Sequence, residues 1–190
     1  MTTRDSTRQV MAGHVPIGGG APVSVQSMTD TDTRDAEATI AQINRLQQAG
    51  CEIVRIAVPD PEAADALGLI RKAVRIPIVA DIHFDHKLAL ASIEAGVDKL
   101  RINPGNIGSR ARVRELAAAA RDKGIPIRIG VNLGSLPREL LEKHGRTARA
   151  MTEAALGHIG LLEREGFYDI VVSLKASDVP RTVEAYRTLS

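Results

Sequence analysis

The chain has 190 residues and a net charge of +2, with 44% hydrophobic and 25% charged residues, which describes one ordinary globular domain. Aromatic residues make up only 2%, which argues against stacking on nucleic-acid bases, and a single cysteine excludes an internal disulfide framework and fits a reducing cytoplasm. The first residues lack the apolar core of a signal peptide and no stretch suits a membrane span, so we expect a cytoplasmic protein with no membrane or nucleic-acid partner.

Residues 1–22 differ from the rest of the chain. The stretch HVPIGGGAPVSV, which begins at His14 and has glycine at 18, 19 and 20, predicts a β-hairpin with a Gly-rich turn. We expect this hairpin to act as a lid over the N-terminal ends of the strands that follow.

From residue 23 to residue 190 one theme repeats: a short β-branched run, a turn, and a helical pattern that ends near a glycine. The runs predict strands at 23–29, 52–58, 76–82, 99–103, 126–132 and 169–175. The helical patterns lie at 34–49, 61–74, 86–95, 109–123, 148–165 and 178–189, with a further short helix at 137–143. Thr31, Asp32 or Thr33 can cap the first helix.

Alternating strands and helices predict an α/β fold with parallel strands. A doubly wound dinucleotide-binding sheet carries G-x-G-x-x-G after its first strand, but here that strand runs into SMTDTDT. We therefore predict a TIM-type (β/α) barrel with six of its eight βα units present, preceded by the hairpin.

Polar residues inside the strands also favour a barrel. In EIVRIAV, Arg55 alternates with Val54 and Ile56, which suit the helix-covered face, so Arg55 points inward. The same alternation on other strands turns Arg101, Arg128 and Lys175 into the same interior. Because several like charges buried together are costly, an anionic ligand is the simplest counterion, and guanidinium groups match phosphate oxygens well.

Neutral and acidic residues complete this predicted site. Asn103 and Asn132 share the inner faces and can donate to hydroxyl or phosphate oxygens, as can Gln26 near the top of the first strand. Asp81 and His83 also point inward, as site residues or as a structural pair. The loop NPGNIGS adds backbone N–H groups at a helix N-terminus. Cys51 suits a small buried hydrophobe, and no metal-ligand spacing is present.

These segments, taken in order, resemble a known enzyme family. The motifs are VPIGGGAPVSVQSMT, EIVRIAVP, VADIHFD, LRINPGNIG, IRIGVNLGSL and VSLKASD. Together they resemble the N-terminal barrel of bacterial 4-hydroxy-3-methylbut-2-en-1-yl diphosphate synthases, over about residues 7 to 190. The resemblance implies isoprenoid biosynthesis by the methylerythritol phosphate pathway, through reductive ring opening of 2-C-methyl-D-erythritol 2,4-cyclodiphosphate. It implies substrate binding by the following residues: Arg55, Arg101, Asn103, Arg128, Asn132 and Lys175.

The resemblance also implies parts that this sequence lacks. Members of the family carry two further barrel strands and a C-terminal domain in which three cysteines and a glutamate bind a [4Fe-4S] cluster, reduced by flavodoxin or ferredoxin. They act as homodimers. With Cys51 alone, this segment is expected to bind no cluster and to be inactive by itself. Two alternatives stay open: another phosphate-binding barrel enzyme, such as an aldolase with Lys175 as Schiff-base lysine, and a non-catalytic anion-binding module.

Overall fold

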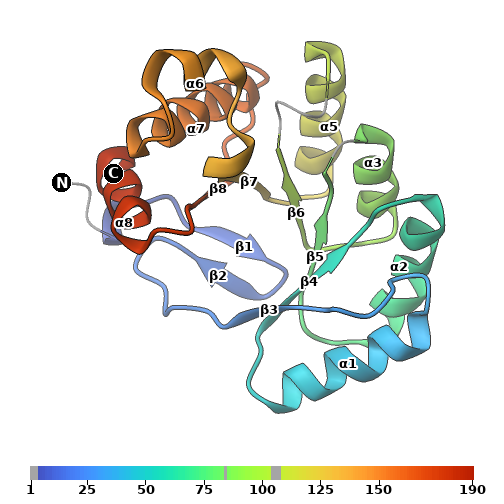
Figure 1. Cartoon of the computed structure of the whole chain (residues 1–190). Coiled ribbons are helices and arrows are strands. Elements are labelled where there is room, and N and C mark those ends of the chain that lie inside the picture. Colours follow the sequence, from blue (N-terminus) through green and yellow to red (C-terminus); the bar gives the residue numbers. More distant parts are fainter. Residues whose placement is uncertain (1–3, 84, 104–107) are drawn as a thin grey trace.

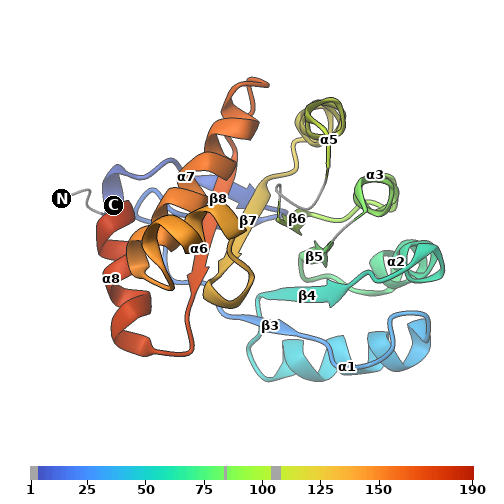
Figure 2. The ribbon, with the colours of Figure 1, turned by 45° about the horizontal axis from the view of Figure 1, so that its top comes forward.

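The computed structural model describes residues 4–83, 85–103 and 108–190, and within them six parallel strands form one curved sheet (Figure 1). The strands are β3 (Gln26–Met28), β4 (Ile53–Ala57), β5 (Ile78–Asp81), β6 (Lys99–Ile102), β7 (Ile127–Asn132) and β8 (Ile170–Lys175). Each strand pairs with the next one along the chain. In Figure 2 the strands follow an arc with helices on its outer side, as in part of a (β/α) barrel. The predicted fold class is confirmed.

The connecting helices also fall where the sequence predicts them. They are α1 (Ala36–Gln48), α2 (Pro61–Ala73), α3 (His86–Glu94), α5 (Arg110–Asp122), α7 (Ala148–Glu163) and α8 (Val179–Leu189). The short helix before α7 is α6 (Arg138–His144), one residue later than predicted. None of the helices in the described part of the chain is long and apolar enough to cross a membrane.

The cap of α1 was predicted wrongly. Asp35 is the N-cap, and its carboxylate accepts a hydrogen bond from the backbone N–H of Ala38. Thr33 instead donates its hydroxyl to the Ala57 carbonyl at 2.7 Å, and Asp32 pairs with the adjacent Arg34. Thr31 contacts the side chains of Thr39 and Gln42 further along α1, so none of the three candidates is the N-cap.

Glycines end several helices as expected from the sequence. Gly50 has φ +92° and Gly96 has φ +86°, values that favour glycine over residues with a Cβ. At these turns the chain leaves a helix and enters the following strand.

The outward faces of the strands build the main core. Val54 and Ile56 on β4 are fully buried in the same apolar cluster as Leu67 and Ile70 of α2. The alternation predicted for β4 is therefore confirmed, and the opposite face of the sheet is left for other residues.

The N-terminal hairpin is present, but its turn differs from the prediction. Strands β1 (Val10–Ala12) and β2 (Val15–Ile17) are joined through Gly13 and His14, and the glycine run 18–20 follows β2. Gly13 supplies the positive φ of +57° that a two-residue turn needs. The Gly-rich turn was thus placed one strand too late.

The hairpin packs against the inner face of the sheet near its N-terminal end. Ala12 and Val15 form a small buried cluster with Ile53 and Val79, which point inward from β4 and β5. The interior therefore has an apolar floor at this end and opens toward the C-terminal ends of the strands.

Candidate functional site

A cavity of about 360 Å³ lies at the C-terminal end of the sheet, and all six strands contribute to its lining. It is lined by Met28, Arg55, Ala57, Asp81, His83, Arg101, Arg128, Gly130, Val131, Asn132, Ser173 and Lys175. Catalytic and binding residues of (β/α) barrels lie at this end of the strands. The four cations predicted to converge thus do line one cavity.

Sheet register explains how residues far apart in sequence meet. Arg101 on β6 and Arg128 on β7 are Cα partners, and four residues further along β7 Asn132 is the Cα partner of Lys175 on β8. Because side chains alternate with period two along each strand, residues in phase with these pairs share the inner face. Parallel pairing therefore stacks positive side chains in neighbouring rows.

Asp81 is the carboxylate at the centre of this cluster. Its side chain is 4% exposed and accepts a hydrogen bond from Arg101 Nη1 at 2.9 Å. Arg55 Nε lies 3.4 Å from Asp81 Oδ2. His83 Nε2 lies 3.4 Å from Asp81 Oδ1, the oxygen that Arg101 also contacts. A single carboxylate thus orients two arginines and a histidine, while four cations line the cavity.

Arg55 has an additional soft contact. Its Nε and Nη2 atoms lie 3.2 and 3.1 Å from the sulfur of Met28 on β3. A thioether is a weak acceptor, so this contact holds the guanidinium in place without neutralising it. The contact with Met28 therefore adds no negative charge to that supplied to Arg55 by Asp81.

Arg128 is held by a neutral partner. Its Nη2 donates to Ser173 Oγ at 2.6 Å. Burial and the nearby charge of Arg55 lower the pKa of Arg128 from its ordinary value. The folded protein therefore holds this positive charge in surroundings that disfavour it.

Gly130 makes room for one of these cations. A Cβ on Gly130 would lie 2.5 Å from Arg101 Nε and 2.7 Å from Nη2. Only a residue without a side chain lets Arg101 lie across β7 in its present position. The guanidinium of Arg101 therefore occupies the space beside Gly130.

The remaining predicted residues take other places. Gln26 points into the interior but begins β3, opposite Ile53, so it lies below the cavity, and Met28 lines the cavity in its stead. Asn103 directly follows β6 and is half-buried, outside the set of described residues that line the cavity. Most of the NPGNIGS loop, residues 104–107, lies outside the described residues.

Sequence reasoning missed Lys99. This residue begins β6, two positions before Arg101, so alternation places it on the same inner face. It is 2% exposed and sits beneath the cavity, with Nζ 3.5 Å from Gln26 Oε1. The sequence KLRIN already indicated this, because its lysine and arginine are two residues apart and therefore lie on the same face of a strand.

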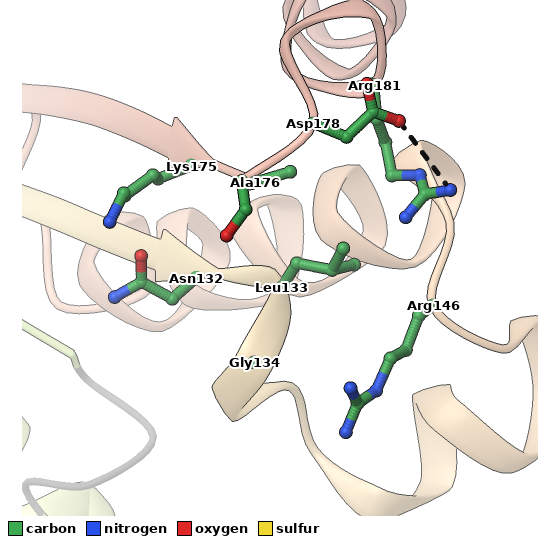
Figure 3. Close-up of a pocket in the computed structure, with 9 residues that line it drawn as sticks. Asn132, Leu133, Gly134, Arg146, Lys175, Ala176, Asp178 and Arg181 are labelled. Carbon is green, nitrogen blue, oxygen red and sulfur yellow. Dashed lines mark ion pairs between the residues drawn. The ribbon is translucent and has the colours of Figure 1, made fainter.

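A second cavity of about 420 Å³ adjoins the first and was also not predicted. Figure 3 shows Lys175 and Asn132 on one side of Leu133, with Arg146 and Arg181 on the other. Arg181 forms a long ion pair with Asp178 at 3.8 Å, and Arg146 lies in the connection before α7. Lys175 and Asn132 line both cavities, so the positive region continues across the mouth of the sheet.

Comparison with known proteins assigns the family. The family described as GcpE TIM-barrel domain matches residues 7–190. This chain belongs to the GcpE family. A protein of Geobacter sulfurreducens named 4-hydroxy-3-methylbut-2-en-1-yl diphosphate synthase (flavodoxin) is 63% identical over 97% of this chain. Proteins of the same name from Thermodesulfovibrio yellowstonii and Listeria monocytogenes are 62% and 58% identical over 100% and 96% of this chain.

This GcpE barrel spans about half the length of the curated relatives it matches, 52%, 55% and 50% of those three proteins. Solved structures show the same fold at low identity. Dihydropteroate synthases of Vibrio fischeri and Yersinia pestis align with TM-scores of 0.61 and 0.62 at 12% and 13% identity. They cover 95% and 94% of this chain, and it covers 71% and 68% of theirs.

The iron–sulfur cluster implied by the family does not fit the residues of this GcpE barrel. Such clusters are held by several cysteine thiolates, and the 190 residues contain only Cys51. Cys51 is buried two residues before β4, and its Sγ lies 3.1 Å from the Ile53 carbonyl. Among the described residues, no group of three or more His, Cys, Asp or Glu side chains could hold a metal ion.

Proposed function

We propose that this chain is the substrate-binding barrel of a 4-hydroxy-3-methylbut-2-en-1-yl diphosphate synthase and holds the cyclic diphosphate of 2-C-methyl-D-erythritol. The observation that carries the proposal is the convergence of Arg55, Arg101, Arg128 and Lys175 on one cavity with a single carboxylate. A ligand with two negatively charged phosphate groups would offset this excess of positive charge. The relatives are named for a diphosphate product, which supports a ligand with two phosphate groups.

The depth of each residue in the cavity indicates which part of the ligand it would bind. Arg101 and Arg128, neighbours on β6 and β7, face the deeper part of the cavity, and their forked donors suit the two phosphate groups. Lys175 and Asn132 at the rim hold the oxygens nearest the opening. When a C–O bond of the ring breaks, a diphosphate oxygen gains negative charge, and fixed cations stabilise that charge without reorganising.

Reduction of the substrate draws on parts beyond these residues. We include a flavodoxin as electron donor, as in the names of the relatives, and cluster ligands outside the 190 residues. In this proposal the barrel contributes binding, orientation and charge neutralisation.

Binding of the purified protein to the cyclic diphosphate, measured by calorimetry, tests the proposal. Truncating one partner of a buried charged contact costs roughly 2–5 kcal/mol, so Arg128→Ala should weaken binding by about 30-fold or more. The matched control is Arg75→Ala, because Arg75 is exposed and follows α2 at the opposite end of the sheet. Folded wild-type protein that fails to bind, or an Arg128→Ala variant that binds normally, would refute the proposal.

A further inference from the structure

Lys99 is a buried lysine that the proposed binding role does not use. Its side chain is among the largest that are fully buried in the protein. Among the described residues its one hydrogen-bond partner is Gln26 Oε1, at 3.5 Å, and no carboxylate lies within ion-pair distance. One long contact satisfies at most one of the three ammonium donors. A charged amine held this way is costly unless another negative charge compensates it.

The surroundings of Lys99 are positive from above and apolar from below. Burial, together with repulsion from Arg128 on β7 and Arg55 on β4, lowers the pKa of Lys99 to about 8. Asp81 on β5 lies one row higher and is engaged by Arg101, and Tyr186 of α8 acts on Arg128. Beside Lys99, its Cα partner Val79 on β5 is apolar and belongs to the buried cluster that includes Ala12 and Val15 of the hairpin.

We propose that Lys99 is a positioning residue for the anion site: its amine forms a second tier of positive charge beneath the arginines and takes up a proton when a diphosphate binds above it. The inference rests on the proposed function, since the cavity above must accept an anion. Lys99 is not among the described residues that line the cavity. It therefore acts on the bound anion through Arg55, Arg128 and the electrostatic potential in the cavity.

The direction of the coupling follows from electrostatics. Negative charge in the cavity offsets the repulsion from Arg55 and Arg128, so it favours the protonated amine and raises the pKa of Lys99. The contribution of Lys99 to the affinity is then fully present below pH 8 and is lost as the pH rises through the pKa of the bound state. Near pH 8, where the free amine is about half protonated, binding should take up about half a proton.

Desolvation beside cations is also how proteins activate an amine nucleophile. Here that chemistry is disfavoured by position, because Lys99 lies under the arginines and its neighbour Gln26 begins β3 below the cavity. A carbonyl carbon in the cavity would have to pass the guanidinium groups to reach Nζ. The contacts of Lys99 therefore favour an electrostatic role over a nucleophilic one.

Calorimetry at pH 8 in two buffers of different ionisation enthalpy counts the protons taken up with the cyclic diphosphate. Each phosphorus of this ligand carries one strongly acidic group, so the ligand does not titrate near pH 8, and arginine stays charged. Wild-type protein should take up about half a proton, and its dissociation constant should rise by up to about tenfold per pH unit above pH 8. Lys99→Met should take up none and bind about tenfold more weakly at pH 7.5.

Two further variants sharpen the result. Lys99→Arg keeps the charge without titrating, so it should retain affinity and lose the pH dependence. Lys123→Met is the control, because Lys123 is an exposed lysine after α5 that pairs with Glu94. Tight binding by the wild type with no proton uptake would overturn the inference, as would equal uptake by Lys99→Met. If Lys99→Met does not fold, the numbers of protons taken up by the wild type and by Lys99→Arg test the inference.

The outcome also separates this inference from the proposed function. If the wild type does not bind the cyclic diphosphate, the proposed function fails. The role of Lys99 is then tested by measuring the protons taken up when sulfate binds, because sulfate does not titrate in this range. Sulfate binding without uptake would overturn it, and binding with uptake that Lys99→Met lacks would support it.

Discussion

Replacing Arg128 with methionine should stabilise the free protein and remove its response to anions. Burial and the positive charges of Arg55 and Arg101 all disfavour the guanidinium, as the lowered pKa of Arg128 indicates. Methionine is of similar length, carries no charge and fills irregular space well. The substitution therefore relieves repulsion in the protein without ligand and deletes a binding group.

The net effect is the difference between two modest terms. A like-charge contact in a partly exposed site contributes roughly 1–2 kcal/mol of repulsion at an effective dielectric constant near 20. Against this, the hydrogen bond from Nη2 to Ser173 Oγ is lost, which costs about 1 kcal/mol, and so is a weaker attraction to Asp81. We expect a gain of about 1 kcal/mol, or 2–4 °C in Tm for a domain of this size.

Thermal unfolding with and without the cyclic diphosphate measures both effects. At one hundred times its Kd a ligand stabilises the folded state by about 2.7 kcal/mol, so the wild type should gain roughly 5–10 °C. Arg128→Met should gain little, while the exposed-site control Arg75→Met should behave as wild type. A variant that is more than about 1 kcal/mol less stable than wild type, yet keeps the full ligand shift, would refute this reasoning.

Three other substitutions probe the site and the core. Gly130→Ala should displace Arg101 and weaken anion binding about tenfold with an unchanged far-UV circular dichroism spectrum, because the clash is with a flexible side chain. Normal affinity would contradict it. Asp81→Asn should destabilise the free protein by roughly 2–4 kcal/mol in urea unfolding and make sulfate strongly stabilising; indifference to sulfate would contradict it. His158→Met should flatten the loss of stability below about pH 6.5 in urea titrations. Burial lowers the pKa of His158, so protons bind the unfolded chain preferentially there, and an unchanged slope would contradict it.

The sequence sufficed for the elements and for the faces of the strands. Strands and helices are local, and the alternation of Arg55 with Val54 and Ile56 reports which face is buried against helices. Period two says nothing about height along the barrel axis, which depends on the register between strands. Gln26 was therefore placed near the top, whereas pairing with Ile53 puts it below the cavity.

Local hydrogen bonds were harder to predict than strands. Three candidates for the α1 cap lay within four residues of Asp35, and tertiary contacts decided among them, since Thr33 is drawn to the Ala57 carbonyl of β4. The hairpin turn shows the same limit. Gly13 and the glycine run 18–20 all have positive φ, so composition alone did not distinguish the turn from the segment after it.

Lys99 links the N-terminal hairpin to the proposed anion site at the C-terminal ends of the strands. Ala12 and Val15 pack against Ile53 and Val79, so apart from Gln26 the described surroundings of Lys99 on this side are apolar and solvate its charge poorly. Relief can come only from the side where the arginines face the open cavity. The apolar floor therefore increases the free energy gained when an anion enters from above, and a polar substitution such as Val15→Asn should weaken proton coupling even though it touches no cation. Unchanged proton uptake in that folded variant would show that the floor has no such role.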